Sequence, residues 1–531
     1  MAITINTAPV LLNAAYHPII FEVSSDRYAS DVYSITSVSS GTGAFARYAV
    51  ASHTYKVGDI VTGSAFTSTS AAYNVRQTVT VISGSYFETD LAFVTGGTGA
   101  GTMTRTNDNF QMKCETLAFD LDKKTITNCG NNGGFAQFTT SATHFFSVGS
   151  VVYIQDTASG NYDGIATVTA VTSNTFITDQ AYIATTSVGG VRDSRVVGSK
   201  FQSVVTISGT PQFRMNCAGH LESIMSLDLF DSEPTNIQTP LPNSLKIFAI
   251  RFTESYDDVD GLYTESDLKY SSVATATRAV LQRVDGVNIN SAYVINPPTS
   301  FKFLTEAPNN KLIRVGEEEQ LHFLYAGTTQ FRAGITKYNL AGVAQAEVYT
   351  TLTTISDYKG VLPINSNHFD NTVSKFDIWL VDSVPNAYSE LRTFIVDKRN
   401  YQNPVRIYFE SNLGLDAFTF NGTYKENLTT NKTTYQKSLP LTYSLKDRSL
   451  TDIYVSAEKT HEAYSDFLPK ATAQWLERLL ASSNVYIKQI GDTYFTPISL
   501  LPGSSVIYDS NGLVQIKIEY AKSVNNLTIG N

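Results

Sequence analysis

A chain of 531 residues is longer than a single hydrophobic core can usually organise, so several domains are expected. Charged residues make up only 16% of the sequence, the net charge is -9 at pH 7, and no Lys/Arg cluster interrupts the acidic background, which argues against direct nucleic-acid binding as the main task. With no apolar run of about 18 residues and no secretory signal, we expect no membrane insertion and synthesis in a cytoplasm.

Short apolar runs rich in β-forming residues predict a mainly antiparallel β protein with few, short helices. The first run is Ile19–Val23, and later runs are Phe248–Phe252, Val405–Phe409 and Val514–Tyr520. Clusters of Gly, Asn, Asp and Ser separate them, as turns between strands require. The predicted fold class is therefore all-β and multidomain, built from β-sandwich or barrel domains.

An internal repeat occupies the N-terminal part of the chain, with a spacing of about 90 residues. The first copy comprises Phe45–Val61 and Thr78–Phe93, and the second comprises Phe135–Val152 and Thr167–Tyr182. In each copy a Val-Gly turn opens a strand, a Tyr precedes a Thr-Val-Thr strand, and Phe-x-Thr-Asp ends the next strand. We expect two superimposable, barrel-like modules of roughly 60 residues each, near the lower limit for independent folding.

Two further patterns lie between the copies. Gly96–Gly101 is glycine-rich but does not lead into a helix, so we interpret it as a turn rather than a phosphate-binding loop. The stretch Phe110–Leu121 alternates apolar and polar residues with one slipped position between Cys114 and Leu117. That slip predicts a β-bulge.

Helical patterns occur in two segments, Gly219–Phe230 and Pro469–Leu480. Pro469 suits a first helical turn, and Trp475 shares one face with several leucines. We expect both segments to be helices that cover the core at the edge of a sheet.

These elements predict a body interrupted by two inserted modules. The expected divisions are an N-terminal β body at 1-43, module 1 at 44-105, a linking β segment at 106-133, module 2 at 134-195, the continued N-terminal body at 196-310, and one or more C-terminal β domains at 311-531.

Histidine and cysteine give no metal-binding pattern. Neither H-x-x-x-H nor H-E-x-x-H occurs, and His53 matches His144 in the repeat, which favours a repeated structural hydrogen bond over a repeated metal site. The cysteines, Cys114, Cys129 and Cys217, are odd in number and widely spaced, so we expect reduced thiols.

The weak candidates for metal ligands are Asp258 and Asp260, in the sequence Asp257–Gly261. Alternating carboxylates before a glycine suit the oxygen ligands that calcium prefers. The register that would place these residues in an EF-hand puts Tyr256 at its first position, so the EF-hand fails and a solvated β-turn is the favoured interpretation.

Catalytic motifs are missing from the sequence. It contains no G-x-S-x-G, no P-loop, and no G-x-G-x-x-G after a strand. We therefore expect no enzymatic activity and no cofactor. A polysaccharide-degrading activity would need two carboxylates across a sugar, which a sequence alone cannot reveal. Tyr and Phe dominate the aromatic residues, which favours protein interfaces over sugar sites.

Two resemblances point to a class of protein. The repeat is similar to small β-modules of phage structural proteins, through Val57–Asp59 and Asn161–Gly164, although Ser150 replaces the Asp in the second copy. The rest resembles tail or baseplate-type proteins of phages and prophages of Bacteroidetes, through the ordered segments His17–Asp26, Asp31–Ile35, His220–Phe230, Leu245–Asp258, Arg406–Glu426, Ala471–Ile487 and Val514–Asn525.

The second resemblance implies a structural subunit of a virion tail, in a ring, tail tip or baseplate. The implied partners are other tail proteins and further copies of the chain in a symmetric homo-oligomer. A host-surface adhesin that binds glycan, or a head or tail decoration protein, is the alternative.

Overall fold

The computed structural model describes residues 3–9, 12–14, 18–28, 31–155, 157, 160–184, 188–207, 210–230, 234, 236–238, 241–278, 293–295, 302–325, 329–355, 359–384, 386–439, 441–444, 446, 448–508, 514–523 and 528–529. Strands make up 55% and helices 6% of the chain, which confirms the predicted all-β class. The chain forms two compact units: unit 1 comprises Met1–Ile224 and Lys246–Ala276, and unit 2 comprises Met225–Leu245 and Thr277–Asn531.

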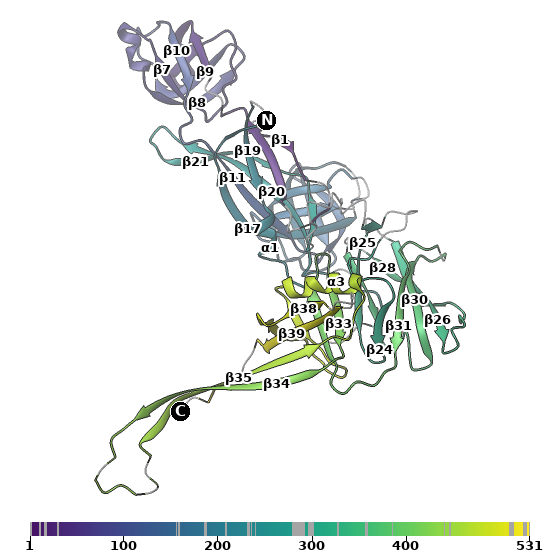
Figure 1. The fold of residues 1–531 in the computed structure, drawn as a ribbon. Coiled ribbons are helices and arrows are strands. Elements are labelled where there is room, and N and C mark those ends of the chain that lie inside the picture. The colour runs from purple at the N-terminus through teal and green to yellow at the C-terminus, as the bar shows by residue number, and fades with distance from the viewer. Residues whose placement is uncertain are drawn as a thin grey trace. The chain divides into compact units, whose positions relative to one another are not determined.

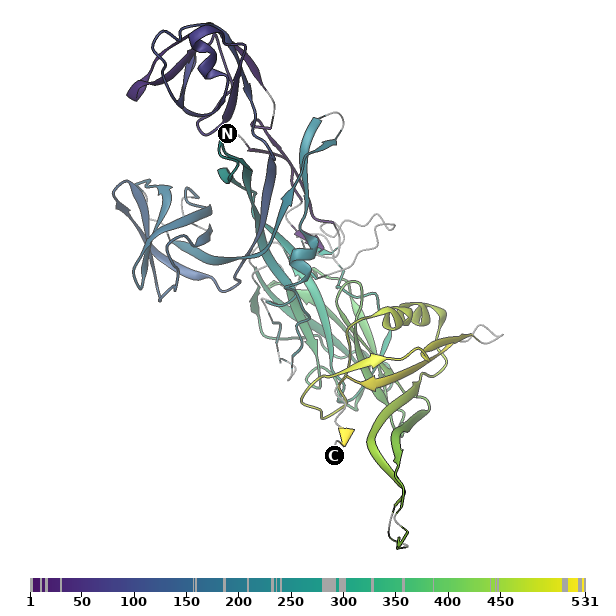
Figure 2. The ribbon, with the colours of Figure 1, turned by 90° about the vertical axis from the view of Figure 1, so that its left-hand side faces the viewer.

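Unit 1 carries two small β-barrels (Figure 2). The first contains β4 (Val32–Ile35), β5 (Ser37–Ser40), β6 (Phe45–Ala49), β7 (Ile60–Ser64), β8 (Arg76–Ser83), β9 (Tyr86–Ala92) and β10 (Gly101–Arg105), with the short 3-10 helices η1 (Thr42–Ala44) and η2 (Ser68–Tyr73). The second contains β12 (Lys124–Asn132), β13 (Phe135–Thr140), β14 (Val151–Gln155), β15 (Gly164–Val171), β16 (Thr175–Ala181) and the start of β17 (Gly189–Gln202).

Both barrels have the same strand order. In the first, β4 and β5 are halves of one bent strand, separated only by Thr36. The order runs β5-β6-β9-β8-β7-β10, and β10 pairs with β4 to close the barrel. In the second barrel, the single strand β12 corresponds to both β4 and β5, because its start pairs with β17 and its end pairs with β13. The strand order is β12-β13-β16-β15-β14-β17. The sequence repeat is thus a repeat of topology.

The Asp of each Phe-x-Thr-Asp motif holds the barrel hairpin in register. The backbone N–H of Thr78 donates to Oδ1 of Asp90 at 2.8 Å, and that of Thr167 donates to Oδ1 of Asp179 at 2.9 Å. Each Asp therefore ties the end of its strand to the start of the preceding Thr-Val-Thr strand. This shared bond explains why both copies keep the motif.

The Val-Gly turn is also alike in both barrels. Gly58 and Gly149 have φ values of 90° and 88°, a left-handed conformation that glycine adopts without strain. The next side chain, Asp59 or Ser150, accepts a hydrogen bond from the backbone N–H three residues earlier, at 2.8 Å and 3.1 Å. Either residue can therefore complete the turn.

Asp59 has a second role that Ser150 cannot take. Its carboxylate is fully buried, with Nε of Arg105 at 3.0 Å and Nε of Arg27 at 3.5 Å. Judged by the pairing of β10 with β7 and of β17 with β14, Asp193 stands in the second barrel where Arg105 stands in the first. The second barrel therefore lacks both the buried acid and the arginine that pairs with it in the first barrel.

The second barrel is held by apolar contacts together with the buried Arg192, whose Nη1 donates to the carbonyl oxygen of Asp120 at 3.0 Å. Its Val151 packs with Leu117, Phe119, Ile247 and Ala249, which belong to the body of unit 1. Because these side chains need no charged partner, the second barrel does not require the ion pairs that hold the first.

The body of unit 1 is formed by two sheets. One has the order β1-β3-β19-β18, and the other continues from the second barrel as β17-β11-β20-β22-β2, with β21 paired to β20. The bounds are β1 (Ile3–Thr7), β2 (Leu12–Ala14), β3 (Ile20–Ser25), β11 (Gln111–Phe119), β18 (Val205–Ile207), β19 (Thr210–Asn216), β20 (Leu245–Asp257), β21 (Tyr263–Tyr270) and β22 (Ala274–Thr277), with helix α1 at Ala218–Glu222.

The bulge predicted within Phe110–Leu121 is not in that strand. Thr116 of β11 pairs with Gly198 of β17, but Leu117 pairs with Val196, whereas β11 pairs with β20 in one continuous register. The extra residue, Val197, lies in the partner strand β17, so the prediction is wrong for β11. The slipped apolar pattern of β11 instead reflects side chains that are buried on both faces from Cys114 to Phe119.

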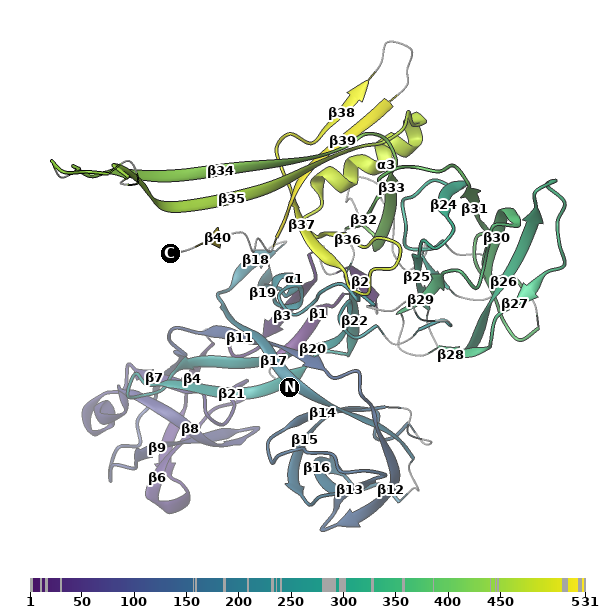
Figure 3. The same ribbon diagram turned by 90° about the horizontal axis from the view of Figure 1, so that it is seen from below.

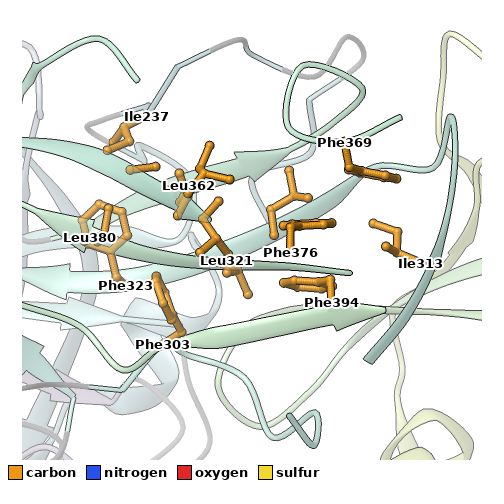
Figure 4. Packing of buried hydrophobic residues seen from close by; sticks show 14 of the residues in the cluster. Ile237, Phe303, Ile313, Leu321, Phe323, Leu362, Phe369, Phe376, Leu380 and Phe394 are labelled. Carbon is orange, nitrogen blue, oxygen red and sulfur yellow. The ribbon is translucent and has the colours of Figure 1, made fainter. Parts of the chain in front are cut away.

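Unit 2 contains a β-sandwich whose core is rich in phenylalanine (Figure 4). One sheet has the order β24-β31-β30-β26-β27, with β28 paired to β26, and the other has the order β23-β25-β29. The bounds are β23 (Val294–Ile295), β24 (Lys311–Arg314), β25 (Glu319–Tyr325), β26 (Thr329–Asn339), β27 (Val348–Tyr349), β28 (Thr353–Ile355), β29 (Lys359–Ile364), β30 (Val373–Val381) and β31 (Arg392–Asp397). Phe323 of β25 and Phe376 of β30 are both fully buried in this core.

A further sheet of unit 2 has the order β33-β32-β36-β37-β39-β35-β34, with β38 and β40 paired to β39 and β35. The bounds are β32 (Val405–Glu410), β33 (Leu415–Phe420), β34 (Tyr424–Gln436), β35 (Leu450–Tyr464), β36 (Val485–Ile487), β37 (Thr496–Leu500), β38 (Ser505–Tyr508), β39 (Val514–Lys522) and β40 (Thr528–Ile529). Helix α3 (Lys470–Ala481) buries Trp475 against this sheet, which confirms the helix expected at Pro469–Leu480.

The helix expected at Gly219–Phe230 is wrong beyond its first turn. Only Ala218–Glu222 is helical. The carboxylate of Asp228 accepts hydrogen bonds from the backbone N–H groups of Asn243 and Ser244, each at 3.0 Å. These tertiary bonds hold the segment in a non-helical conformation despite its apolar spacing.

The expected domain boundaries also need correction. The limits at residues 44 and 134 fall inside the barrels, because the first strand begins at Val32 in the first barrel and at Lys124 in the second. These first strands were missed because they are rich in Ser, Thr and Asn. Residues 225–245 and 277–310 do not continue the N-terminal body but belong to unit 2. Arg278, for example, donates from Nη2 to Glu410 at 2.9 Å.

Replacing Asp59 with Ala should destabilise the first barrel. Arg27 and Arg105 would each lose a buried acidic partner, although Arg27 would keep Glu254 and Asp267 and Arg105 would keep Asp31. Because the charges stay partly compensated, the cost should be about 2–3 kcal/mol, below that of a fully unpaired buried charge. Hydrogen exchange should show a matching fall in the opening free energy of amides within β7–β10, with amides of β12–β16 unchanged. Ser150→Ala is the control and should cost under about 1.5 kcal/mol, since it removes one hydrogen bond of a turn. Equal effects of the two substitutions would show that the buried ion pairs of Asp59 do not stabilise the first barrel.

Candidate interaction surface

A long exposed hairpin, β34–β35, is called the arm below (Figures 1 and 3). Its strands pair from Tyr424 with Ala463 at the base to Gln436 with Leu450 near the tip. Only the base is continued by β39, and among described residues the rest of the arm is paired further only by the two-residue β40. Every residue of β34 after Tyr424 is exposed. The arm is about 40 Å long, and beyond its base it is a two-stranded ribbon apart from the short pairing with β40.

Apolar side chains on the arm are open to solvent. Leu428, Tyr435, Leu441, Tyr443 and Leu450 are 62%, 56%, 104%, 58% and 57% exposed. Burying such a side chain fully contributes about 1.5–3 kcal/mol, and an isolated two-stranded hairpin is marginally stable in water. A covering surface would thus stabilise the arm.

The distal arm is basic although the chain is acidic. Residues 429–452 contain four Lys or Arg and two Asp, a net charge of 4 - 2 = +2, against -9 for the whole chain. Lys437, Lys446 and Arg448 are exposed, and none makes an ion pair with a described residue. These cations can therefore meet a negative surface without breaking an internal pair.

Three rings stack at the base of the arm. The ring centroid of His461 lies 5.0 Å from that of Tyr520 and 6.0 Å from that of Tyr424, with interplanar angles of 17° and 26°. The hydroxyl of Tyr424 lies 2.7 Å from Nδ1 of His461. Burial lowers the pKa of His461 and raises the pKa of Tyr424, so both are uncharged at neutral pH.

A groove of about 830 Å³ lies beside these rings. One wall comes from β34, β35 and β39, and the other from the turn before β25, the loop before β32 and the segment between β36 and β37. Its charged lining residues are Arg314, Lys459 and Lys522, with Glu317, Glu426, Glu458 and Asp492. The signs nearly cancel, at 3 - 4 = -1, so the groove does not select strongly for a ligand of one charge.

The groove does not have the carboxyl chemistry of a glycosidase at the position nearest the stack. A glycosidase general acid needs a raised pKa. Glu426 instead forms an ion pair with Lys459, whose hydrogen bond lowers the pKa of Glu426. This carboxyl is ionised at neutral pH and cannot serve as the acid.

Glu317 also takes part in a buried ion-pair network between two sheets of unit 2. Nη1 of Arg406 lies 3.4 Å from Glu317, and Nη2 lies 2.8 Å from Glu319. All three side chains are at most 3% exposed. Lys311 pairs with the other oxygen of Glu319. The network joins the sandwich to the sheet that carries the arm.

The candidate metal ligands Asp258 and Asp260 lie in the turn between β20 and β21. Oδ1 of Asp258 accepts hydrogen bonds from the backbone N–H groups of Asp260 and Leu262 at 2.9 Å and 2.8 Å. The carboxylate thus caps a β-turn, as the favoured interpretation of the sequence expected. Among described residues, no group of three or more His, Cys, Asp or Glu is placed to hold a metal ion.

The matched histidines make matched structural contacts. Nε2 of His53 lies 2.7 Å from the carbonyl oxygen of Ser83, and Nε2 of His144 lies 3.1 Å from that of Thr175. Each ring thereby ties the loop before the Val-Gly turn to a hairpin of its barrel. His17 lies outside the described residues.

The cysteines and the glycine-rich run are structural. Cys114, Cys129 and Cys217 are free and buried, and burial raises the pKa of Cys114 and of Cys217 to about 12. In the run Gly96–Gly101, the backbone N–H of Gly99 donates to Oγ of Ser70 in η2 at 2.7 Å. A Cβ at Gly99 would lie 2.8 Å from that oxygen, so the glycine permits this close packing.

Sequence reasoning missed the arm. Its strands lack the apolar alternation of a half-buried sheet, because both faces are exposed. The available signal was the run of Thr and Tyr in Tyr424–Gln436, residues that favour strands without defining a core face.

Comparison of the sequence with protein-family models gives no match, and comparison with curated protein sequences also gives none. No helix in the described part of the chain is long and apolar enough to cross a membrane.

Replacing Arg406 with Leu should destabilise unit 2 by about 3–5 kcal/mol, because Glu317 and Glu319 would remain buried without their shared partner. Urea unfolding followed by the fluorescence of Trp475 and Trp379 measures this. The matched control is Arg399→Leu, which breaks an ion pair of an exposed arginine and should cost under about 1 kcal/mol. A loss no larger than that of the control would show that the network does not stabilise the joint.

Proposed function

We propose that the chain is a non-enzymatic structural subunit of a larger assembly. The observation that carries this proposal is the arm, which leaves apolar side chains and the edges of a two-stranded ribbon in solvent. Such a surface gains stability from a protein partner. The low charge content supports the same function, because neutral polar surfaces can be buried without the cost of desolvating charge.

The particular assembly we propose is a bacteriophage tail, with the chain in a ring, the tail tip or the baseplate. The ordered likeness to tail and baseplate-type proteins supports this step. The two barrels, each inserted in the body of unit 1, are suited to contacts with neighbouring tail proteins or with a host surface. The partners in this proposal are other tail proteins and further copies of the chain, and the final location is the virion.

Shortening the arm should prevent assembly without unfolding the protein. In the variant, residues 431–456 are replaced by Asn-Gly, so that Thr430 and Ala457, which pair in the intact hairpin, flank a two-residue turn. The groove and the ring stack remain. We expect a melting temperature within about 3 °C of the unaltered chain, and at least tenfold less incorporation into particles when the variant is supplied during infection.

The control replaces Leu340 and Val343, exposed residues of the turn after β26, with Ser, which leaves both the arm and the β20–β21 hairpin intact. Normal incorporation of the shortened-arm variant would contradict an assembly role for the arm. Binding of the isolated chain to bacterial cells, together with its absence from particles, would instead support the adhesin.

A further inference from the structure

The hairpin β20–β21 in unit 1 has a charge opposite to that of the arm. Residues 257–268 contain four Asp and one Glu with no Lys or Arg, a net charge of -5. The same segment exposes Leu262, Tyr263 and Leu268, at 64%, 53% and 52%. It therefore combines negative charge with open apolar side chains, as the distal arm combines positive charge with open apolar side chains.

Part of this charge is free to meet a partner. Asp258 and Asp260 make no ion pair with a described residue, although Oδ1 of Asp258 caps the turn. Glu265 is paired with Lys113 at 2.7 Å, and Asp267 lies 3.4 Å from Nε of Arg27. The unpaired carboxylates thus gather at the turn, next to Leu262.

We infer that the distal arm of one copy docks on the β20–β21 hairpin of a second copy of this chain. The inference rests on the proposed function and names the partner of the arm. Because the arm belongs to unit 2 and the hairpin to unit 1, the contact joins two different surfaces and is head-to-tail. Head-to-tail contacts close into rings when the rotation allows and otherwise continue as filaments.

Charge selects this contact over two others within the same protein. An arm-to-arm contact would bring Lys437, Lys446 and Arg448 close to their own copies, and like charges at an interface oppose binding. The groove at the base of the arm offers nearly balanced charges, so it would attract a basic arm weakly. The hairpin offers the opposite sign together with apolar side chains.

Thiol crosslinking in assembled particles tests the contact. The native cysteines are all buried, so the introduced residues would provide the accessible thiols. Chains carrying Leu262→Cys and chains carrying Tyr443→Cys are supplied together during infection, and purified particles are treated with a short bismaleimide. We expect a crosslinked dimer whose digestion yields one peptide from each variant, and none when either variant is supplied alone.

A neutralisation cycle then tests the role of charge. One set replaces Lys437, Lys446 and Arg448 with Gln, and the other replaces Asp258 and Asp260 with Asn, which keeps the oxygen that caps the turn. We expect each set to lower the crosslinked fraction about fivefold, and the combined sets to lower it no further, since the charges act on each other. Lys470→Gln, an exposed cation in unit 2 outside the arm, should leave the fraction unchanged.

The outcomes separate this inference from the proposed function. A chain that is present in particles but gives no dimer between the two variants would overturn the head-to-tail contact while the structural role stands. A dimer from Tyr443→Cys alone would replace it with an arm-to-arm contact. If the two neutralised sets lowered the crosslinked fraction independently, so that their fold-changes multiplied, the charges of the arm and of the hairpin would not be in contact.

Discussion

A buried charge is stable only beside an opposite charge, and this constraint governs joints in both units of the molecule. In unit 1, Asp59 lies between Arg27 and Arg105 where the first barrel meets its body. In unit 2, Arg406 lies between Glu317 and Glu319 where the sandwich meets the sheet that bears the arm. Each network therefore connects two elements of its unit.

The two barrels separate what folding requires from what attachment requires. Both keep the glycine of the Val-Gly turn and the Asp that closes Phe-x-Thr-Asp, because those residues set the backbone of the barrel itself. They differ where the barrel meets the body, since Ser150 and Asp193 stand in place of the acid and the arginine of the first barrel. An apolar cluster takes over that joint. A module of this kind can therefore change its neighbour without changing its fold.

The sequence was informative wherever local chemistry decides the structure. The barrels and the helix around Trp475 were predictable, because turns and amphipathic spacing are local signals. The non-helical course after Glu222 was not, because Asp228 is held by residues distant in the sequence. The arm was missed for a different reason: a strand exposed on both faces has no apolar period. The surface that we propose for its partner, around Asp260, was noticed in the sequence only as a possible cation site, because the net charge of the hairpin was not considered.

We propose that this chain is a permanent part of a virion tail. Quantitative mass spectrometry of particles purified through a density gradient tests it most directly. We predict that the chain co-purifies at a fixed copy number per particle, as a closed symmetric ring requires, and at a constant ratio to other tail proteins across the gradient. Absence from purified particles, with the chain recovered only as free protein from infected cells, would contradict the claim.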